Sequence, residues 1–299
     1  QKGKQKRKAT KKENKKKNEQ NITGTVDILF NLEAKSDVVL DFRNNSDDAV
    51  LGIWKNEKPV KYYFENGHIV IPKSYLSSGY NSITIDFTSA NGSLNRSQDF
   101  LYTLLVPDRA STVFPCFDQP DLKAHFKLSL SIPAKWIALS NGKTDSVQYI
   151  NNDIKRLFFA KTKPISTYLF AFATGDFRIE TKTVQGKTFS LYHRETDTEK
   201  LNRNLPIIFN LHAQSVAWLE EYTGIEYPFN KLDFILIPGF QYSGMEHPGA
   251  IYYRDSRLLL DSDPSPTQKL MQANLIAHEV SHQWFGNLVT MKWFNDVWL

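Results

Sequence analysis

His278-Glu279-Val280-Ser281-His282 is the stretch from which the architecture of this chain can be worked out. On an α-helix, side chains four positions apart share one face, so His278 and His282 can present two imidazole nitrogens to one zinc ion. Glu279 lies beside them, where a carboxylate can exchange a proton with water that the metal has acidified. The pattern indicates a zinc hydrolase with Glu279 as the catalytic acid-base. The alternative is a surface helix that carries two histidines by chance.

The helix around this stretch is predicted to run from Pro266 to about Phe285, with Gly286 at its end. A second helix is predicted over residues 197–222, where apolar residues recur at helical spacing. Gly224 suits its C-cap, and Pro206 is expected to mark a first turn or a break.

Between these helices, a strand is predicted over residues 232–237 and a short edge strand over residues 251–253. A glycine-bearing loop containing Gly239 and Gly244 separates the two strands. Residues 194–299 are therefore interpreted as an α+β domain that holds the metal motif.

The chain before residue 194 has a different periodicity. Val26, Ile28, Phe30 and Leu32 alternate with polar residues, which is typical of a half-buried strand. Further strands are predicted over residues 38–42, 60–64, 69–71, 83–87, 126–132, 157–160, 168–172 and 189–192. Hairpin turns are predicted at Asn66-Gly67, Asn91-Gly92 and Asn141-Gly142. Residues 21–193 are therefore interpreted as an antiparallel β-sandwich or saddle-shaped domain, and the fold class as α+β multidomain.

The net charge of +5 is unevenly placed. Residues 1–20 contain ten Lys or Arg and two Glu, so residues 21–299 carry 27 basic and 30 acidic side chains. Such a basic end can touch phosphates or a membrane surface, but a solvated, disordered or wrongly assigned segment is the favoured interpretation. No nucleic-acid partner is expected for the globular part, which is slightly acidic.

A single cysteine, Cys116, allows no intramolecular disulfide, and 299 residues with 41% hydrophobic content are enough for about two domains. No run of eighteen apolar residues is present, so no transmembrane helix is expected. Periplasmic, secreted and cytoplasmic locations all stay open, as does the oligomeric state.

Two further groups of residues stand out. In Ser243-Gly244-Met245-Glu246-His247-Pro248-Gly249, glycines would let a substrate backbone approach and Glu246 could bind a cation, although a solvated Glu in a Gly-rich turn is the alternative. The run from Phe114 to Pro120, Phe-Pro-Cys-Phe-Asp-Gln-Pro, is interpreted as a structural corner of the β domain.

Together with the His278–His282 helix and the Trp284-Phe285-Gly286-Asn287 run behind it, these motifs resemble the M1 family of zinc aminopeptidases, gluzincins with a thermolysin-like catalytic domain behind an N-terminal β-saddle. The resemblance covers about residues 21–299. It implies a zinc cofactor, peptide substrates with a free N-terminus, and a substrate-binding loop at Gly244, Met245 and Glu246. The Glu246 carboxylate would meet the α-amino group, because a buried ammonium without a partner costs several kcal/mol.

The sequence departs from the family pattern at three points. His247 stands where the family more often has Asn. No residue of the segment 104–109 matches the upstream Gln or Glu that contacts the substrate amine in many members. The third zinc ligand implied by the resemblance, a Glu nineteen positions after His282, would fall two positions past Leu299. The family's transition-state tyrosine would also lie further downstream.

A catalytic zinc site needs three protein ligands and a water, and residues 1–299 supply two of the protein ligands, His278 and His282. The chain as given is therefore expected to bind zinc weakly and to show little or no peptidase activity. Two other readings stay open: another zinc hydrolase on the same scaffold, such as an endopeptidase or an epoxide hydrolase, and a non-catalytic binding or scaffold fragment.

Overall fold

The structure is a computed structural model that describes residues 22–44, 47–90 and 92–296. Its contacts divide the chain into two compact units, one within Gln1–Ser93 and Ser111–Phe117 and the other within Leu94–Ala110 and Asp118–Leu299. The structure does not describe residues 1–20 or Asn91, so the predictions made for residues 1–20 and for the Asn91-Gly92 turn lie outside the described residues. The domain boundary at residue 193 stays a prediction.

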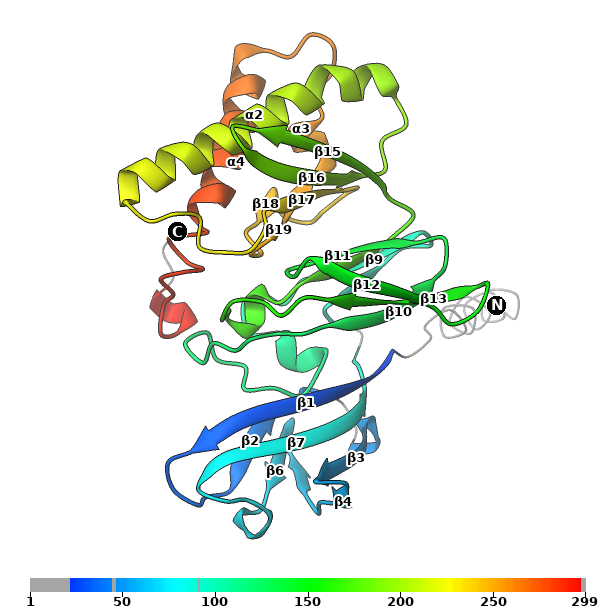
Figure 1. Cartoon of the computed structure of the whole chain (residues 1–299), viewed down its shortest axis with the longest axis vertical. Coiled ribbons are helices and arrows are strands. Elements are labelled where there is room, and N and C mark those ends of the chain that lie inside the picture. Colours follow the sequence, from blue (N-terminus) through cyan, green and yellow to red (C-terminus); the bar gives the residue numbers. More distant parts are fainter. Residues whose placement is uncertain (1–21, 45–46, 91, 297–299) are drawn as a thin grey trace, which may run out of the picture. The chain divides into compact units, whose positions relative to one another are not determined.

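The first unit is built from two antiparallel sheets (Figure 1). The longer pairing joins β1 (Thr23–Leu32) to β7 (Gly79–Thr88) over ten residues, and the alternation in β7 buries Ile83, Ile85 and Phe87. In the same sheet, β3 (Val50–Lys55) pairs with β7, and β4 (Lys58–Pro59) pairs with β3 at the edge. The second sheet contains β2 (Val38–Asp41), β6 (His68–Ile71) and β5 (Tyr63–Glu65).

The Asn66-Gly67 hairpin is present between β5 and β6. Asn66 and Gly67 have φ values of 52° and 77°, the left-handed region that a two-residue turn of this kind needs. Residues 114–117 of the predicted corner belong to this unit, where the backbones of Cys116 and Asp41 bond in both directions at 2.8 and 3.1 Å. Cys116 is buried there, in agreement with a structural corner.

The second unit begins with two more antiparallel sheets. Their strands are β8 (Leu94–Arg96), β9 (Phe100–Thr103), β14 (Phe172–Gly175) and β11 (Ile137–Ser140) in one sheet, and β10 (Ser129–Pro133), β13 (Ile154–Phe159) and β12 (Thr144–Tyr149) in the other.

Two sequence predictions in this part are wrong. The Asn141-Gly142 pair is not a hairpin, because β11 pairs with β14 while β12 pairs with β13, and neither residue has positive φ. The strand predicted over residues 168–172 is instead a 3₁₀ turn, η4 (Thr167–Leu169), and β14 starts only at Phe172. The other 3₁₀ turns of the chain are η1 (Asp47–Ala49), η2 (Lys73–Tyr75), η3 (Ala110–Thr112) and η5 (Phe294–Asp296).

A mixed five-stranded sheet carries the rest of the second unit, in the order β15-β16-β17-β19-β18. Its strands are β15 (Arg178–Val184), β16 (Lys187–His193), β17 (Asp233–Ile237), β18 (Gly244–Met245) and β19 (Ala250–Arg254). Strand β19 lies inside the sheet, parallel to β17 and antiparallel to β18, so the prediction of an edge strand at residues 251–253 is wrong. The edge is β18, formed by part of the predicted loop.

Helices α2 (Thr198–Thr223) and α4 (Pro266–Ser281) cover one face of this sheet, and the short α3 (Asp255–Leu258) follows β19 (Figure 1). Phe234 and Leu236 of β17 pack against the helices, while Ile235 and Ile237 pack against strands and loops on the opposite face. Burial on both faces explains why residues 234–237 of β17 are all apolar rather than alternating with polar residues.

Helix α2 begins at the N-cap Asp197, whose carboxylate accepts from Lys200 N at 3.0 Å, and ends at Gly224 with φ of 67°. Both ends follow the sequence prediction. Pro206 does not break the helix, contrary to the expectation, and lies inside it. The buried residues Ile208 and Phe209 pack in the core next to it, and this packing offsets the loss of one backbone hydrogen bond.

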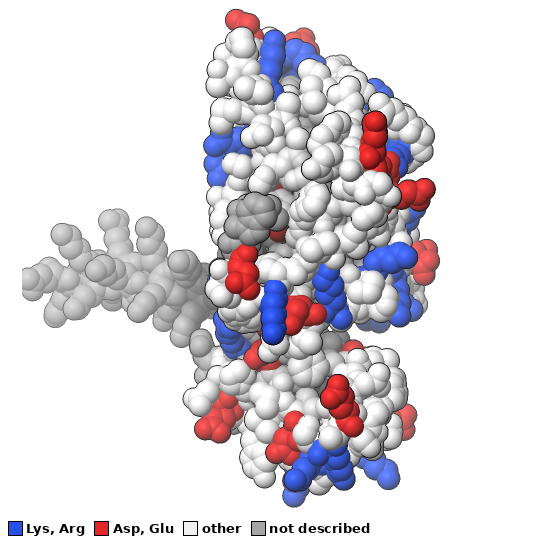
Figure 2. All heavy atoms as spheres, turned by 90° about the vertical axis from the view of Figure 1, so that its left-hand side faces the viewer, with Lys and Arg blue, Asp and Glu red and all other residues white. Residues whose placement is uncertain are grey.

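Basic and acidic side chains are interspersed on the face shown in Figure 2. The part of the chain that the structure describes contains no helix long and apolar enough to cross a membrane.

Candidate metal centre and substrate loop

Helix α4 carries the metal motif and has a well-defined start. Ser265 Oγ accepts from Gln268 N at 3.2 Å, and Gln268 Oε1 accepts from Ser265 N at 2.8 Å, with Pro266 in the first turn. This capping box pairs two backbone donors that the helix leaves free.

The helix ends at Ser281, four residues before the predicted end. His282 is the C-cap, and its backbone stays in the right-handed helical region. Beyond it, the hydrogen bonds tighten to a three-residue spacing, from Gln283 N to Val280 O at 3.1 Å and from Trp284 N to Ser281 O at 3.1 Å. Such a tighter turn is a common way to end a helix. Because His282 keeps helical backbone angles and its N–H bonds His278 O at 3.2 Å, the two histidines still lie on one face.

The two imidazoles meet at their Nε2 atoms, which are 3.1 Å apart, with the rings at 84° to each other. Two nitrogens bound to one tetrahedral zinc at about 2.0–2.1 Å would be ~3.3 Å apart. The Nδ1–H group of His282 donates a hydrogen bond to Phe285 O at 3.0 Å, so in this tautomer the Nε2 lone pair is free for a metal. The spacing therefore fits a shared cation.

Glu279 is buried beside these histidines, with 4% of its surface exposed. Its Oε2 atom has no hydrogen-bond partner among the described residues. Burial, and secondly the charge of Glu246, hold the pKa of the Glu279 carboxyl well above its usual range. A buried carboxyl with a free oxygen can hold a proton or turn toward a cation.

Glu246 comes from the loop after β18 and joins the same cluster. Donor atoms of Glu246, Glu279 and His282 all lie within 4.8 Å of one another. Burial raises the pKa of the half-buried Glu246 carboxyl, and the neighbouring His282 opposes the shift. Two carboxylates this close repel each other when both are ionised, so a bound cation or a substrate ammonium would stabilise the site. The histidine His278 lies beside this cluster, against His282.

Gly244 lies directly against Glu279. A Cβ on Gly244 would overlap the carboxyl group and lie 2.7 Å from Glu279 Cγ. The missing side chain therefore makes room for the buried carboxylate of α4. Met245 is buried and pairs with Tyr252 across β18 and β19, which fixes the direction in which the next residue, Glu246, leaves the sheet.

Two side chains that follow α4 hold the loop at Glu246. The amides of Gln283 and Asn287 donate to Glu246 O at 2.9 and 2.7 Å. Both side chains are completely buried. The loop after β18 and the segment after α4 are therefore joined through one carbonyl oxygen, which accepts two hydrogen bonds. Asn287 lies in the Trp-Phe-Gly-Asn run, but nothing local in the sequence identifies Gln283.

The far end of the loop has its own anchors. Asn141 Nδ2 donates to Pro248 O at 3.0 Å and to Leu169 O at 2.9 Å, while its Oδ1 accepts from Ala171 N at 2.7 Å. The Lys231 ammonium donates to Gly249 O. Sequence reasoning missed both residues, and Asn141 was assigned to a turn.

His247 is fully buried beside the ring of Tyr252, at a centroid distance of 4.4 Å. Neither of its ring nitrogens has a hydrogen-bond partner among the described residues, and burial lowers its pKa to about 3. The side chain at the departure from the family pattern is therefore a neutral core residue. Tyr168, another residue that the sequence did not indicate, has its pKa raised by burial and then by Glu246.

Comparison with known proteins gives two family matches. The Peptidase M1 N-terminal domain matches residues 10–169, and the Peptidase family M1 domain matches residues 208–299. Glutamyl aminopeptidase of Rattus norvegicus is 38% identical over 197 residues, which is 64% of this chain and 20% of the relative. Endoplasmic reticulum aminopeptidase 2 of Homo sapiens is 38% identical over 195 residues, again 64% of this chain and 20% of the relative.

Aminopeptidase M1 of Arabidopsis thaliana is 33% identical over 233 residues, which is 75% of this chain and 26% of the relative. The matched region thus spans a fifth to about a quarter of the length of these relatives.

Proposed function

Because the chain belongs to peptidase family M1, we propose that it contributes the metal helix and the amino-terminus anchor of a zinc-dependent aminopeptidase, which removes N-terminal amino acids from peptides. The observation that carries this proposal is the meeting of Glu246, Glu279 and His282 within 4.8 Å, although they come from a loop and a helix separated by more than thirty residues. Perturbed carboxyl groups gathered beside histidines favour a catalytic site over chance burial.

His278 and His282 would hold zinc through their Nε2 atoms, which already converge to 3.1 Å. When bound, zinc supplies Lewis acidity that polarises a carbonyl oxygen and lowers the pKa of water. The hydrogen bond of His282 Nδ1 to Phe285 O keeps this ring in the tautomer that a metal requires.

Glu279 would take a proton from water and deliver it to the leaving amine. Its raised pKa suits the first of these steps, because a carboxylate that holds a proton more tightly is a stronger base. The contact with Gly244 fixes the carboxyl group, so the proton is held at a defined place.

Glu246 would bind the free α-amino group of the peptide. An internal peptide bond offers no such ammonium, so this anchor favours an aminopeptidase over an endopeptidase. The bonds from Gln283 and Asn287 hold the backbone of Glu246 at a fixed position relative to α4, which sets how far the amine lies from the metal ligands.

The metal part of the proposal is tested by titrating zinc into the chain of residues 1–299. We expect weak binding, because two of three ligands come from His278 and His282, and a loss of at least tenfold in His278→Gln and in His282→Gln. His125→Gln, at an exposed histidine of the same unit, serves as the matched control. Equal zinc affinity in all four proteins would contradict the assignment and favour the scaffold reading.

The substrate part is tested with a short peptide and its N-acetylated form. The free peptide should bind more tightly, and Glu246→Gln should remove the difference. An endopeptidase on this scaffold would accept both forms equally. We further propose that residues 1–299 alone release little or no product from an aminoacyl anilide, and robust turnover by this chain would overturn that statement.

A further inference from the structure

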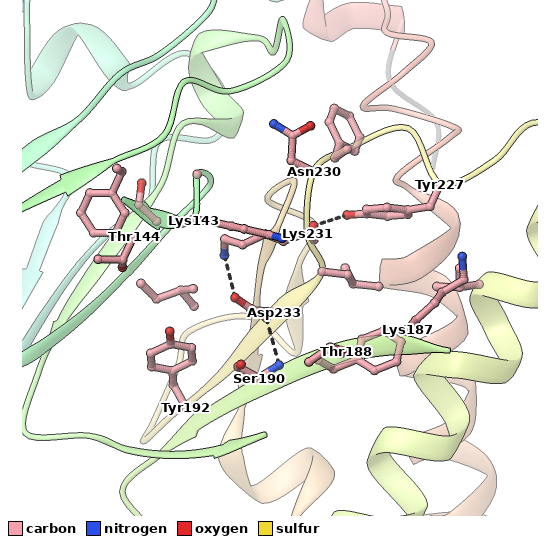
Figure 3. A pocket seen from close by; sticks show the side chains of 18 of the residues that line it. Lys143, Thr144, Lys187, Thr188, Ser190, Tyr192, Tyr227, Asn230, Lys231 and Asp233 are labelled. Carbon is pink, nitrogen blue, oxygen red and sulfur yellow. Dashed lines mark hydrogen bonds and ion pairs between the residues drawn. The ribbon is translucent and has the colours of Figure 1, made fainter. Parts of the chain in front are cut away.

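Two lysines are linked to the two ends of the substrate loop, residues 244–249. At the far end, Lys231 lies on the wall of a cavity of about 810 Å³, where its ammonium forms an ion pair with Asp233 at 3.0 Å (Figure 3). The same ammonium donates to Gly249 O. This lysine therefore has a carboxylate partner. The lysine linked to the near end is Lys123, and it has no such partner among the described residues.

Lys123 lies in the segment between the corner at residues 114–120 and β10. Its ammonium donates to Asn287 O at 2.9 Å and to Leu288 O at 2.8 Å, although these residues lie 164 and 165 positions further along the chain. The side chain is half-buried, and burial lowers the pKa of the ammonium. The hydration that this charge gives up is therefore compensated by two carbonyl oxygens of the segment after α4.

Asn287, the first of these two residues, connects the metal helix to the substrate loop. Its N–H donates to His282 O at 2.9 Å, and its side-chain amide donates to Glu246 O at 2.7 Å. Thr290 Oγ1 offers Asn287 O only a longer bond of 3.3 Å. The Lys123 ammonium is therefore the closer donor to the backbone of the residue that bonds both motifs.

Leu288, the second residue, is bonded to the other donor of the loop carbonyl. Leu288 N donates to Gln283 O at 3.2 Å, and the Gln283 side chain donates to Glu246 O at 2.9 Å. Both side chains that hold Glu246 O are thus linked to the Lys123 ammonium through residues 287 and 288. The two imidazoles of the metal motif depend instead on the helical backbone of α4, which sets their spacing.

We propose, resting on the function proposed for Glu246, that Lys123 is a positioning residue for the amino-terminus anchor. By holding residues 287 and 288, it fixes Glu246 at a defined place relative to His282. Loss of Lys123 should loosen the substrate loop and weaken the preference for a free α-amino group, because that preference depends on where the carboxylate lies. Zinc affinity should stay, because α4 sets the spacing of the imidazoles. A role in stability alone would lower both.

Amide hydrogen exchange tests the link without substrate or metal. In Lys123→Met, exchange at residues 244–250 should accelerate by roughly threefold or more, while β10, which follows Lys123 in the chain, keeps its rate. Lys123→Arg should keep the wild-type rates, because a guanidinium can donate to both carbonyls. Lys127→Met, at an exposed lysine four positions later, is the matched control. Unchanged exchange at residues 244–250 in Lys123→Met, or equal acceleration in β10, would overturn the proposal.

Peptide and zinc titrations of the full chain supply the second readout. In Lys123→Met, the ratio of affinities for a short peptide and its N-acetylated form should fall by roughly threefold or more, while zinc affinity stays within about twofold of the wild type. Lys123→Arg should keep the ratio. A preserved ratio in Lys123→Met, or a parallel loss of zinc affinity, would overturn the proposal. Equal binding of both peptide forms by the wild-type chain would contradict the anchor at Glu246 instead, and hydrogen exchange then decides the role of Lys123.

Discussion

Gly244 of β18 and Glu279 of α4 are in direct contact, so closely that no side chain fits between them. A Cβ on Gly244 would overlap the Glu279 carboxyl group and lie 2.7 Å from its Cγ. The catalytic carboxyl proposed for the metal helix therefore occupies the space that the glycine of the substrate loop leaves empty. The two motifs depend on each other sterically, although 35 positions separate them in the sequence.

Gly244→Ala should destabilise the chain by about 1–3 kcal/mol, the usual range for forcing extra volume into a packed site. In a Glu279→Ala background the same substitution should cost less than about 0.5 kcal/mol, because the truncated side chain leaves room for the methyl group. Urea unfolding of the four proteins measures both values. An equal cost in the two backgrounds would show that the methyl group does not meet Glu279.

Much of this site could be predicted from local sequence patterns. The four-residue spacing of His278 and His282 predicts their shared face, and Pro266 marks where the helix starts. The family membership and the order of antiparallel sheets followed by helices and a mixed sheet were also correctly predicted. These features depend on neighbours in the sequence or on whole motifs.

The contacts that assemble the site could not be predicted in this way. Asn141 suggested a hairpin because Asn-Gly pairs favour turns, yet its side chain bonds Pro248, which lies 107 positions away. The short apolar run at residues 251–253 suggested an edge strand, but Gly244 and Met245 form a further strand that pairs with it and takes the edge of the sheet. Side-chain bonds between distant segments leave no periodic signal in the sequence.

The carbonyl of Glu246 has two donors, and this redundancy can be measured. Gln283→Ala or Asn287→Ala alone should each cost about 0.5–1.5 kcal/mol, because the other amide still bonds the carbonyl. The double variant should cost more than the sum of the two, since it leaves a buried acceptor without a partner. Urea unfolding gives the three values, and strict additivity would contradict the shared role.

Loosening of the loop is the second readout for the same variants. Amide hydrogen exchange in residues 244–250 should accelerate in the double variant more than in either single variant. Exchange in β1 and β7 of the first unit serves as the internal control and should stay unchanged.

The buried pair of Lys231 and Asp233 should be far more sensitive to substitution than the half-buried pair of Lys187 and Glu220. Lys231→Met leaves Asp233 without its counter-ion and removes the donor to Gly249 O, so we expect a loss of about 3–5 kcal/mol. Lys187→Met should cost no more than about 1 kcal/mol, because side-chain exposures of 37% and 22% let water screen that pair. Denaturant unfolding compares them, and similar costs would mean that burial does not set the strength of these pairs.

His212 should make the chain less stable in acid. Burial lowers its pKa to about 4, although the bond to Ile208 O opposes the shift, whereas an unfolded histidine titrates near ~6.5. Between these values the unfolded chain binds a proton that the folded chain does not. The contribution of His212 is therefore fully present above pH ~6.5 and is lost as the pH falls toward 4, by about 1.4 kcal/mol per pH unit.

His212→Gln isolates this contribution, because the other titrating groups are the same in both proteins. Burial also lowers the pKa values of His247 and His193, so these residues likewise make the chain less stable as the pH falls. The raised pKa values of Glu246 and Glu279 change the stability in the opposite direction. The variant should be less stable at pH 7, because the stacking of His212 on Phe234 at 3.9 Å and its bond to Tyr253 are weakened. Between pH 6 and 5, however, it should lose about 1 kcal/mol less than the wild type. Urea unfolding at both pH values measures the difference, and parallel losses in the two proteins would show that His212 is already protonated in the folded chain.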